Sequence, residues 1–431
     1  MSAADAGPAS FPPIRLLTYS TLFPHAGLPN HGVFVENRLR HLLATGAAVS
    51  TVVAPVPWFP SRAAQFGSWS RHAWADRDEL RGGLHIHHPR FPVIPRLGMS
   101  VAPLGLLAGS LGTVRRLVRS GLQFDVIDAH YLYPDGVAAV MLGQWLGKPV
   151  VITARGSDVT ELPDHPVPRR WIRWAMAQAA ALISVSAGLK ADMVTLGVPP
   201  EKVTVLRNGV DLQRFQPRDR ESCRQALGLD GPTLLSVGLL TERKGHRRTI
   251  EAMTALPGWR LLIVGQGPQR AELLALISAY GLGDRVTLLG AHPHSELPNI
   301  YSAADALVLA SSREGWANVL LESMACGTPV VASNIPGNPE VVREAAAGVI
   351  IADNTPAGIA AGVRALDQVR RPRTETRAYA ERFSWDETSA GQIAVFRQVM
   401  QSGQDGSAPP ASDAPAPKSV VPDAVTRAVI S

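Results

Sequence analysis

The sequence predicts an α/β protein with two domains, each built around a parallel β-sheet. At 431 residues the chain is too long for one ordinary core, and two domains of roughly 200 residues are the usual result. Short apolar segments alternate with helical patterns from Ile14 to Ile351, which is typical of parallel sheets joined by crossover helices. The alternation pauses once, at Arg207-Asn-Gly-Val-Asp211 and the polar stretch up to Gly231. Asn-Gly predicts a turn there, and the polar stretch predicts an interdomain linker.

The first half holds seven predicted strands and one unusual helix. The strands lie near Ile14–Thr18, Val49–Ala54, Leu84–Arg90, Phe124–Ala129, Val150–Thr153, Leu182–Val185 and Val203–Leu206. The uncharged stretch Leu97–Val114 is long enough for a membrane span to be considered, but it contains four glycines and Pro103. Its apolar residues follow the spacing of one helix face, so we predict a surface helix that buries Leu104, Leu107, Leu111, Val114 and Val118.

The second half repeats the alternation. Its six predicted strands are Thr233–Val237, Leu261–Val264, Val286–Leu288, Ala306–Ala310, Val330–Ala332 and Val349–Ile351. An apolar pattern over residues 377–400 predicts helices that close the fold. Residues 1–10 and 401–431 are rich in Ala, Pro, Ser and Asp and are predicted to be disordered. The predicted boundaries are therefore 11–210 for the first domain, 211–231 for the linker and 232–376 for the second domain.

Composition and cysteine usage indicate a protein of the cytoplasm. Hydrophobic residues make up 46% of the chain and charged residues 18%, which excludes an intrinsically disordered protein. The two cysteines, Cys223 and Cys326, lie far apart and match neither a disulfide framework nor a metal-binding spacing. The first fifteen residues carry no basic start followed by an apolar run, as a secretory signal would.

The net charge of +6 is concentrated in the first half. Between Arg62 and Arg119 there are nine arginines against three acidic residues. No nucleic-acid recognition motif accompanies this charge, so we expect no nucleic-acid partner. An anionic membrane surface is a better candidate, since the segment also carries Trp58, Phe59, Trp69 and Trp74. A solvated basic face, with these tryptophans in the core, is the alternative.

The most informative motif joins two carboxylates, Glu314 and Glu322, across an apolar helix pattern. Eight residues are about 2.2 helical turns, so Glu322 is expected at the far end of a helix that Glu314 opens. Gly315 allows a tight turn before the helix. The first free amides would form an anion site suited to a phosphate: Trp316, Ala317 and Asn318.

Two glycine loops follow predicted strands of the second half. Val237-Gly-Leu-Leu-Thr-Glu-Arg-Lys-Gly245 contains Gly238 and the cations Arg243 and Lys244, which could stabilise the negative charge of a leaving diphosphate. Val264-Gly-Gln-Gly-Pro268 has no third glycine at the dinucleotide spacing, which disfavours a nicotinamide dehydrogenase. Gly265 still allows the backbone to approach a nucleotide closely.

The Glu-x7-Glu motif, followed by Met-Ala-Cys-Gly-Thr-Pro-Val-Val, resembles the nucleotide-sugar site of retaining glycosyltransferases with the GT-B fold, group 1 and family 4-like. The resemblance extends from Ser20 to about Met400. It implies two Rossmann-like, doubly wound domains that face each other across a cleft. The second would bind the donor and the first the acceptor, without a metal or other cofactor. Glu314 would contact the donor sugar and Glu322 the ribose.

The same resemblance assigns residues in the first domain. His130 ends a predicted parallel strand, where ligands bind in open α/β sheets, and resembles the family's active-site histidine. Asp158 follows the next strand and could bind sugar or acceptor hydroxyls, beside Arg155, where many relatives have histidine. Gly32 matches the family's glycine loop. The chain departs from the pattern at Leu239, where many relatives carry an arginine. If that arginine normally holds the phosphate, either Arg243 takes over its role or the donor is held differently; Lys244 is the stronger candidate for a phosphate contact.

These features predict an enzyme that transfers a hexose-type sugar from a nucleotide diphosphate donor to a glycan or lipid-linked acceptor. The resemblance implies retention of configuration and a role in cell-surface polysaccharide assembly. A GT-B nucleotide-sugar epimerase and a non-catalytic nucleotide-sugar-binding subunit are the alternatives. Asp76-Arg-Asp78 has the form of a metal-holding D-x-D, but no apolar strand precedes it, so we predict a solvated turn.

Overall fold

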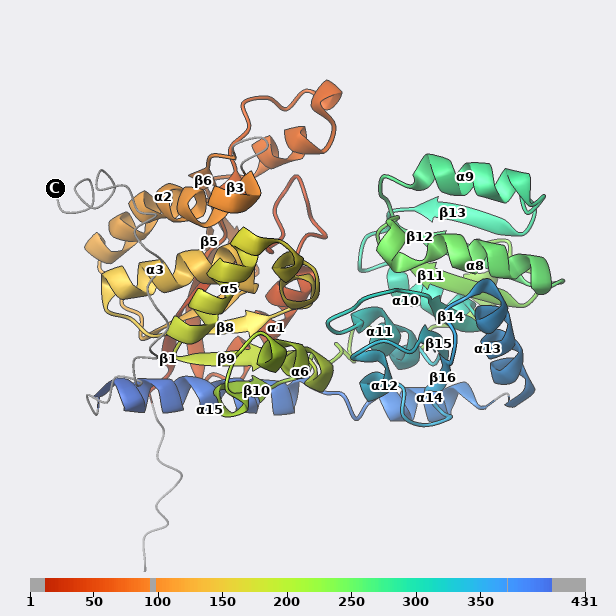
Figure 1. The fold of residues 1–431 in the computed structure, drawn as a ribbon. Helices are drawn as coiled ribbons and strands as arrows, with labels where there is room; N and C mark the ends of the chain where they lie inside the picture. The colour runs from red at the N-terminus through yellow and green to blue at the C-terminus, as the bar shows by residue number, and fades with distance from the viewer. Residues whose placement is uncertain (1–11, 94–97, 370, 405–431) are drawn as a thin grey trace, which may run out of the picture.

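A computed structural model of the protein describes residues 12–93, 98–369 and 371–404. These residues form two α/β halves that lie side by side, each with its own sheet (Figure 1). The predictions of disorder for residues 1–10 and for residues 405–431 lie outside the described residues. Residues 401–404, which were also predicted to be disordered, instead continue the last helix.

The first sheet has eight strands in the order β10-β9-β8-β7-β1-β2-β5-β4. They are β1 (Ile14–Tyr19), β2 (Ala48–Val53), β4 (Asp78–Arg81), β5 (Leu84–His87), β7 (Val126–His130), β8 (Val150–Ala154), β9 (Ala181–Ser184) and β10 (Val203–Val205). Neighbouring strands are parallel except β4 and β5. All seven predicted strands are confirmed, but the third is divided between β5 and β6 (Arg90–Phe91). The short β6 pairs with β3 (Val56–Pro57) instead of joining the sheet.

The second sheet has six parallel strands in the order β13-β12-β11-β14-β15-β16. They are β11 (Thr233–Val237), β12 (Arg260–Val264), β13 (Val286–Gly290), β14 (Ala306–Leu309), β15 (Val330–Ser333) and β16 (Gly348–Ile351), as predicted. In both sheets the chain builds outward to one side and then returns to build the other side. The strand order therefore reverses between β1 and β7 and between β11 and β14. Ligands of doubly wound sheets bind at the carboxyl ends of the strands at this reversal.

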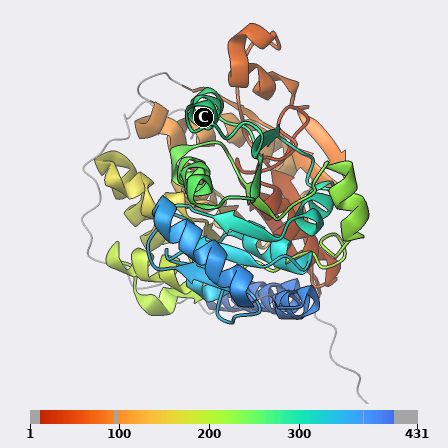
Figure 2. The same cartoon turned by 90° about the vertical axis from the view of Figure 1, so that its right-hand side faces the viewer.

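Helices cover the faces of both sheets. They are α1 (Val33–Ala44), α2 (Gly98–Arg119), α3 (Val137–Leu146), α4 (Ser157–Thr160), α5 (Pro166–Gln178), α6 (Ala187–Thr195), α7 (Arg220–Ala226), α8 (His246–Ala252), α9 (Arg270–Ala279), α10 (Leu297–Ala303), α11 (Asn318–Ala325), α12 (Asn338–Val341), α13 (Pro356–Val369), α14 (Arg373–Ala380) and α15 (Trp385–Gln404). Figure 2 shows α13 in front of the second sheet, where it packs on β15 and β16. The final helix α15 runs back along the first half, where Phe396 packs with Ile14 and Leu16 (Figure 1).

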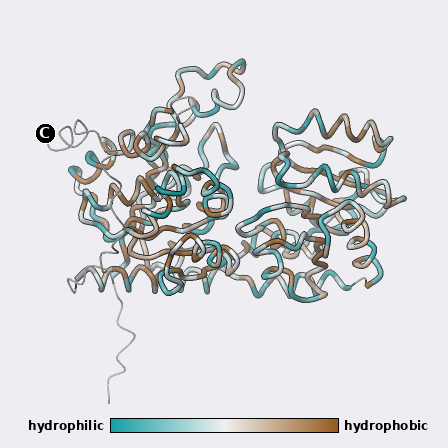
Figure 3. The backbone as a smooth tube through the Cα atoms, in the orientation of Figure 1, coloured by the Kyte–Doolittle hydropathy of each residue, from teal (hydrophilic) through white to brown (hydrophobic). Residues whose placement is uncertain are grey.

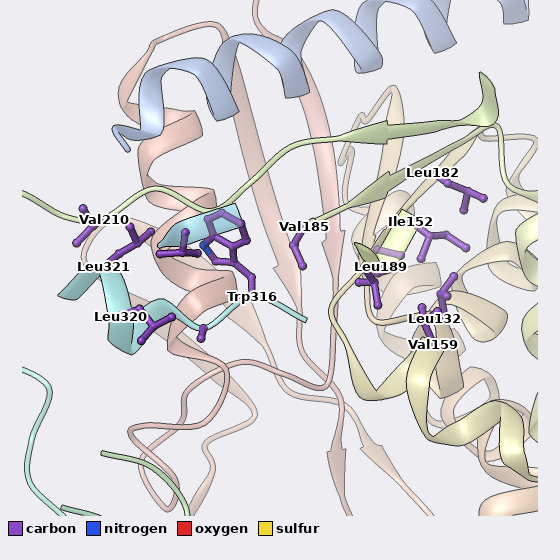
Figure 4. Close-up of a cluster of buried hydrophobic side chains, with 14 of the residues drawn as sticks. Leu132, Ile152, Val159, Leu182, Val185, Leu189, Val210, Trp316, Leu320 and Leu321 are labelled. Carbon is purple, nitrogen blue, oxygen red and sulfur yellow. The ribbon is translucent and has the colours of Figure 1, made fainter. Parts of the chain in front are cut away.

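The hydrophobic core continues from one half into the other. Apolar residues follow the strands of both sheets (Figure 3). One cluster of buried side chains includes Val185 and Leu189 of the first half together with Trp316, Leu320 and Leu321 of the second (Figure 4). Burial of this apolar surface stabilises the contact between the halves.

The predicted linker contains a helix that the sequence pattern does not predict. Within residues 211–231, α7 packs against α10. Arg220 and Arg224 of α7 both form ion pairs with Asp305, at 2.6 and 3.4 Å. The helix is held by charged contacts and has no fully buried side chain, which explains why an apolar pattern did not reveal it.

The unusual helix is α2, but its buried face differs from the predicted one. It is the one described helix that is long and apolar enough to cross a membrane by length and composition alone. Its buried residues are Pro103, Leu106, Ser110 and Val114, whereas Val118 is exposed. The small residues allow close packing: a side chain on Gly109 would collide with the Arg90 backbone, and Ser110 Oγ lies 2.9 Å from the Tyr19 hydroxyl. Leu97, where the predicted segment began, lies outside the described residues.

The D-x-D segment is also different from the prediction. Asp78 begins the edge strand β4 and is not in a turn. Its carboxylate pairs with His87 at 2.5 Å and with Arg116 at 3.4 Å, so it serves to hold β4 on β5 and α2. The strand was missed because it is short and polar, and because one antiparallel neighbour suffices to hold it.

Candidate active site

The predicted site residues come from the strand ends at the two reversals. The loops after β11 and β14 carry Lys244 and Glu314, His130 is the last residue of β7, and the loop after β8 carries Asp158. The two sets meet at Gly315, where a side chain would collide with the Arg155 carbonyl oxygen. A side chain on Gly156 would likewise lie 2.9 Å from the Gly315 nitrogen. The predicted cleft is therefore closed by backbone contact at this point.

Glu314 is buried and held by cations. Lys244 Nζ lies 2.6 Å from its Oε1, Ser311 Oγ donates to the same oxygen at 2.7 Å, and Arg243 Nη1 lies 3.8 Å from Oε2. Burial alone would raise the pKa of Glu314, but the charge and hydrogen bond of Lys244, with Arg243 and Ser311, bring the pKa below its ordinary value. The carboxylate is therefore ionised at neutral pH, next to the strand end.

The cations remain available to a ligand. The ammonium group of Lys244 has three donors, and among the described residues its one hydrogen bond is to Glu314. Arg243 uses Nη1 on the Arg313 carbonyl oxygen at 3.3 Å, and its side chain is 36% exposed. Both can contact a phosphate oxygen without leaving their present partners. Leu239, at the position of the family's arginine, is an exposed side chain.

Glu322 lies near the second reversal in a different environment. Tyr301 donates to Oε2 at 2.9 Å, and His294 Nε2 lies 3.1 Å from Oε1. Burial, followed by the negative charge of Glu322, raises the pKa of Tyr301, which keeps its hydroxyl a donor. Each carboxylate oxygen retains a second lone pair for a ligand hydroxyl. His294 and Tyr301 were not predicted, and no pattern around them in the sequence indicates this role.

The bounds of α11 correct the prediction made from the Glu314–Glu322 motif. α11 begins at Asn318, four residues after Glu314, so Glu322 lies in the middle of the helix and not at its far end. The amide of Asn318 is not free, since it donates to the Trp316 carbonyl oxygen at 3.2 Å. The amides of Trp316 and Ala317 have no partner within the described part of the chain. The predicted anion site is thus reduced to these two amides.

The glycines of the site are explained by close backbone packing. A side chain on Gly265 would collide with the Gly238 carbonyl oxygen, so the loops after β11 and β12 lie in direct contact. Gly238 also faces the aliphatic part of Lys244, since a Cβ added at Gly238 would lie 3.3 Å from Lys244 Cδ. Gly32 has φ 66° and caps α1, and a side chain there would collide with the Leu22 backbone.

His130 is buried between a carboxylate and a guanidinium group. Its Nε2 lies 3.1 Å from Asp128 Oδ2, and its Nδ1 lies 2.6 Å from Arg155 Nη2. Burial lowers the pKa of His130; Asp128 opposes this shift and Arg155 adds to it. Arginine can only donate, so Nδ1 accepts and the proton of the neutral ring is on Nε2. Both ring nitrogens are thus engaged, and the ring does not reach the solvent in this arrangement.

Asp158 is fully buried and binds backbone amides. It accepts hydrogen bonds from the amides of Leu132, Arg155 and Gly156 at 2.7–3.2 Å. These contacts fix the loops after β7 and β8 against each other. The structure therefore places Asp158 in a positioning role and not toward an acceptor hydroxyl.

A further buried carboxylate, that of Asp135, was not predicted. It accepts hydrogen bonds from the amide and the hydroxyl of Thr21, so it ties the loop after β7 to the loop that leads to Gly32. Burial raises the pKa of Asp135 to about 7. The segment Leu-Tyr-Pro-Asp-Gly136 contains this carboxylate, but its sequence is equally typical of a surface turn.

Among the described residues, no group of three or more His, Cys, Asp and Glu side chains is arranged to hold a metal ion. The positive charges near Glu314 belong to the side chains of Lys244 and Arg243. The site thus combines the carboxylates of Glu314 and Glu322, basic side chains at a strand end and glycine loops in close backbone contact. In two doubly wound domains, these features are typical of glycosyltransferases with the GT-B fold.

Comparison with known proteins identifies the family. Residues 31–214 match the family described as Glycosyltransferase Family 4, and residues 218–383 match Glycosyl transferases group 1. A D-inositol 3-phosphate glycosyltransferase of Actinosynnema mirum is 32% identical over 74% of this chain and 84% of its own. A D-inositol 3-phosphate glycosyltransferase 1 of Catenulispora acidiphila is 30% identical over 91% of this chain and 97% of its own. The chain belongs to the group 1 glycosyltransferases.

Solved structures agree on the fold. Sucrose-phosphate synthase from Thermosynechococcus elongatus superposes with a TM-score of 0.73 at 20% identity, over 90% of this chain and all of that one. Anabaena HepE in complex with UDP superposes with a TM-score of 0.65 at 20% identity, over 91% of this chain and all of that one. The GT-B fold and the glycosyltransferase class predicted from the sequence are confirmed.

Proposed function

We propose that the protein transfers a sugar from a nucleoside diphosphate sugar to an acceptor hydroxyl with retention of configuration. The second half would hold the donor and the first half the acceptor. The observation that carries this proposal is the part-buried Glu314–Lys244 ion pair at the strand reversal, with Arg243 beside it. It places an acceptor of hydrogen bonds for sugar hydroxyls next to donors for the diphosphate.

The two residues of the Glu314–Lys244 pair would have different roles, one toward the sugar and one toward the diphosphate. Glu314 is ionised and can accept hydrogen bonds from the hydroxyls of the bound sugar. Lys244 has two unused donors, which would oppose the negative charge that grows on the departing diphosphate. The departing phosphate would help to remove the acceptor proton from the same face, so no enzyme nucleophile and no metal is needed.

The acceptor class can be narrowed to two candidates. The relatives at about 30% identity are named for D-inositol 3-phosphate, which makes a phosphorylated cyclitol the first acceptor to test. A glycan or lipid-linked acceptor of cell-surface polysaccharide assembly is the second candidate. It is favoured by an exposed aromatic and basic projection of the first half (residues 58–77), where Trp58, Trp69 and Trp74 are about half-exposed. These tryptophans are not in the core. We propose a cytoplasmic location, with this projection directed to an anionic membrane.

The Lys244→Ala variant tests the proposal. Loss of one preorganised electrostatic contact typically costs about 10²–10³ in rate, so turnover should fall by this amount while donor affinity changes less. Lys148→Ala is the matched control, since Lys148 lies over the Phe124 ring at the opposite end of the strands. Wild-type activity should also survive EDTA. Full activity of Lys244→Ala, or a strict need for a divalent cation, would contradict the proposal.

A further inference from the structure

A hydrogen-bonded chain of side chains crosses from the first half to α11, and each hydrogen bond in it has a fixed direction. It starts where Arg155 donates to His130 Nδ1 at 2.6 Å, which leaves the Nε2 proton of His130 for Asp128. Arg155 also donates from Nη1 to the side-chain oxygen of Asn208 at 3.3 Å. Because a guanidinium group can only donate, Arg155 fixes the direction of its hydrogen bonds to His130 and Asn208.

Asn208 lies at the junction of the two halves and is buried. Its oxygen accepts from a second guanidinium group, Arg38 Nη1, at 3.2 Å. Arg38 is fully buried and also donates to the Leu206 carbonyl oxygen at 3.1 Å, so it cannot turn away. Two arginines therefore fix the oxygen of Asn208 toward the first half, and its NH₂ group must face the second.

That NH₂ group donates to Asn318 Oδ1 at 3.1 Å. Asn318 is the first residue of α11 and is only partly buried. With its oxygen held inward, its own NH₂ group is turned outward, and Nδ2 has no hydrogen-bond partner among the described residues. This free donor lies four residues from Glu314, beside the unpaired amides of Trp316 and Ala317.

We propose that Asn318 Nδ2 is a donor-binding group that contacts a diphosphate oxygen of the nucleotide sugar, and that Asn208 is the positioning residue that turns it outward. The proposal rests on the proposed function for the location of the diphosphate. Asparagine is required at position 208 because the side chain must accept from two arginines and donate to Asn318 at the same time. Aspartate could only accept, and a hydrophobic residue could do neither.

The test is a double-mutant cycle, with affinities measured by calorimetry for whichever of UDP, GDP and ADP binds the wild-type chain most tightly. Asn318→Ala removes the NH₂ group and should weaken binding about 10- to 100-fold, the usual loss for a hydrogen bond to a charged group. Asn208→Asp should give a similar loss with Asn318 intact, because a carboxylate at 208 makes Asn318 turn its NH₂ group inward. The double variant should bind no more weakly than either single variant.

Asn37→Asp controls for added negative charge, since Asn37 lies on α1 outside this chain of contacts. Losses that add in the double variant, or an Asn318→Ala affinity equal to wild type, would overturn the proposal. If Asn208→Asp does not fold, the comparison of Asn318→Ala with Asn318→Asp decides, since neither side chain can donate and both should bind weakly. If none of the three nucleotides binds the wild-type chain, the proposed function itself fails. If a nucleotide binds wild type and Asn318→Ala equally well, only the role proposed for Asn318 fails.

Discussion

The two acidic residues of the site are held in different ways, and this difference sets their expected roles. Glu314 is surrounded by cations, which fix its charge and position. Glu322 is held by Tyr301 and His294, which are directional hydrogen-bond partners with no net charge when the histidine is neutral. A carboxylate with spare lone pairs in such a setting is suited to a pair of neighbouring hydroxyls, such as those of a ribose.

Replacement of Glu322 by Gln keeps its shape and removes its charge. Charge-assisted hydrogen bonds are worth about 1.5–3 kcal/mol, so affinity for the nucleoside diphosphate should fall about 10- to 100-fold with the fold intact. Tyr301→Phe is the control, because it removes one contact of Glu322 but leaves the charge, and its loss should be smaller. Calorimetry that finds equal affinity for Glu322→Gln and wild type would remove Glu322 from the donor site.

Asp135 should make stability depend on pH. Its pKa is raised from 3.8 to about 7, so the folded state keeps a proton that the unfolded state releases between these values. The free energy of unfolding should therefore fall as the pH rises from about 4 to 7. Asp135→Asn should lose less stability over this range, as measured by thermal midpoints. Asp76→Asn, an exposed carboxyl, is the matched control, and parallel curves for wild type and Asp135→Asn would refute the effect.

Among the helices and strands, those of the parallel sheets were predictable and the others were not. A buried parallel strand must be apolar over most of its length, so β11 and β14 are visible as short runs between turns. Edge strand β4 and helix α7 are held by ion pairs, which leave no apolar period. The face of α2 was misplaced because Gly109 and Ser110 permit close contact without being hydrophobic.

The projection formed by residues 58–77 leads to a prediction about membranes. Arg62 lies over the Trp74 ring at 4.7 Å, and Phe66 and Trp69 are 44% exposed, so cations and aromatic rings share one surface. The segment that carries them stands out from the first half (Figure 1). The protein should sediment with anionic vesicles at low salt, leave them at high salt and ignore neutral vesicles. Phe66→Ser with Trp69→Ser should weaken sedimentation. Equal failure to bind both vesicle types would favour a soluble acceptor.

In the protein as a whole, the site depends on how the two halves meet. Asn30 reaches the His292 carbonyl oxygen at 3.4 Å, and Arg313 reaches that of Thr160 at 2.9 Å. The sequence could predict two domains and the residues Glu314, Glu322 and Lys244, because each lies in a local motif. It could not predict Asn208, His294 or Tyr301, since their roles arise from contacts between segments far apart in the chain. His130, Arg155 and Asp158 were found by resemblance, but Asp128, the carboxylate partner of His130, was not.

The claim that a nucleoside diphosphate is held between the loops after β11 and β14 is tested most directly by hydrogen–deuterium exchange. The full chain would be compared with and without whichever of UDP, GDP and ADP raises its thermal midpoint most, since a ligand of the folded state slows local opening where it binds. We predict that the nucleotide slows exchange in residues 238–246 and 313–322 and leaves the exchange of α2 unchanged. No stabilisation by any of the three nucleotides, or protection confined to another place such as the cavity that Cys223 and Ile300 line between α7 and α10, would contradict it.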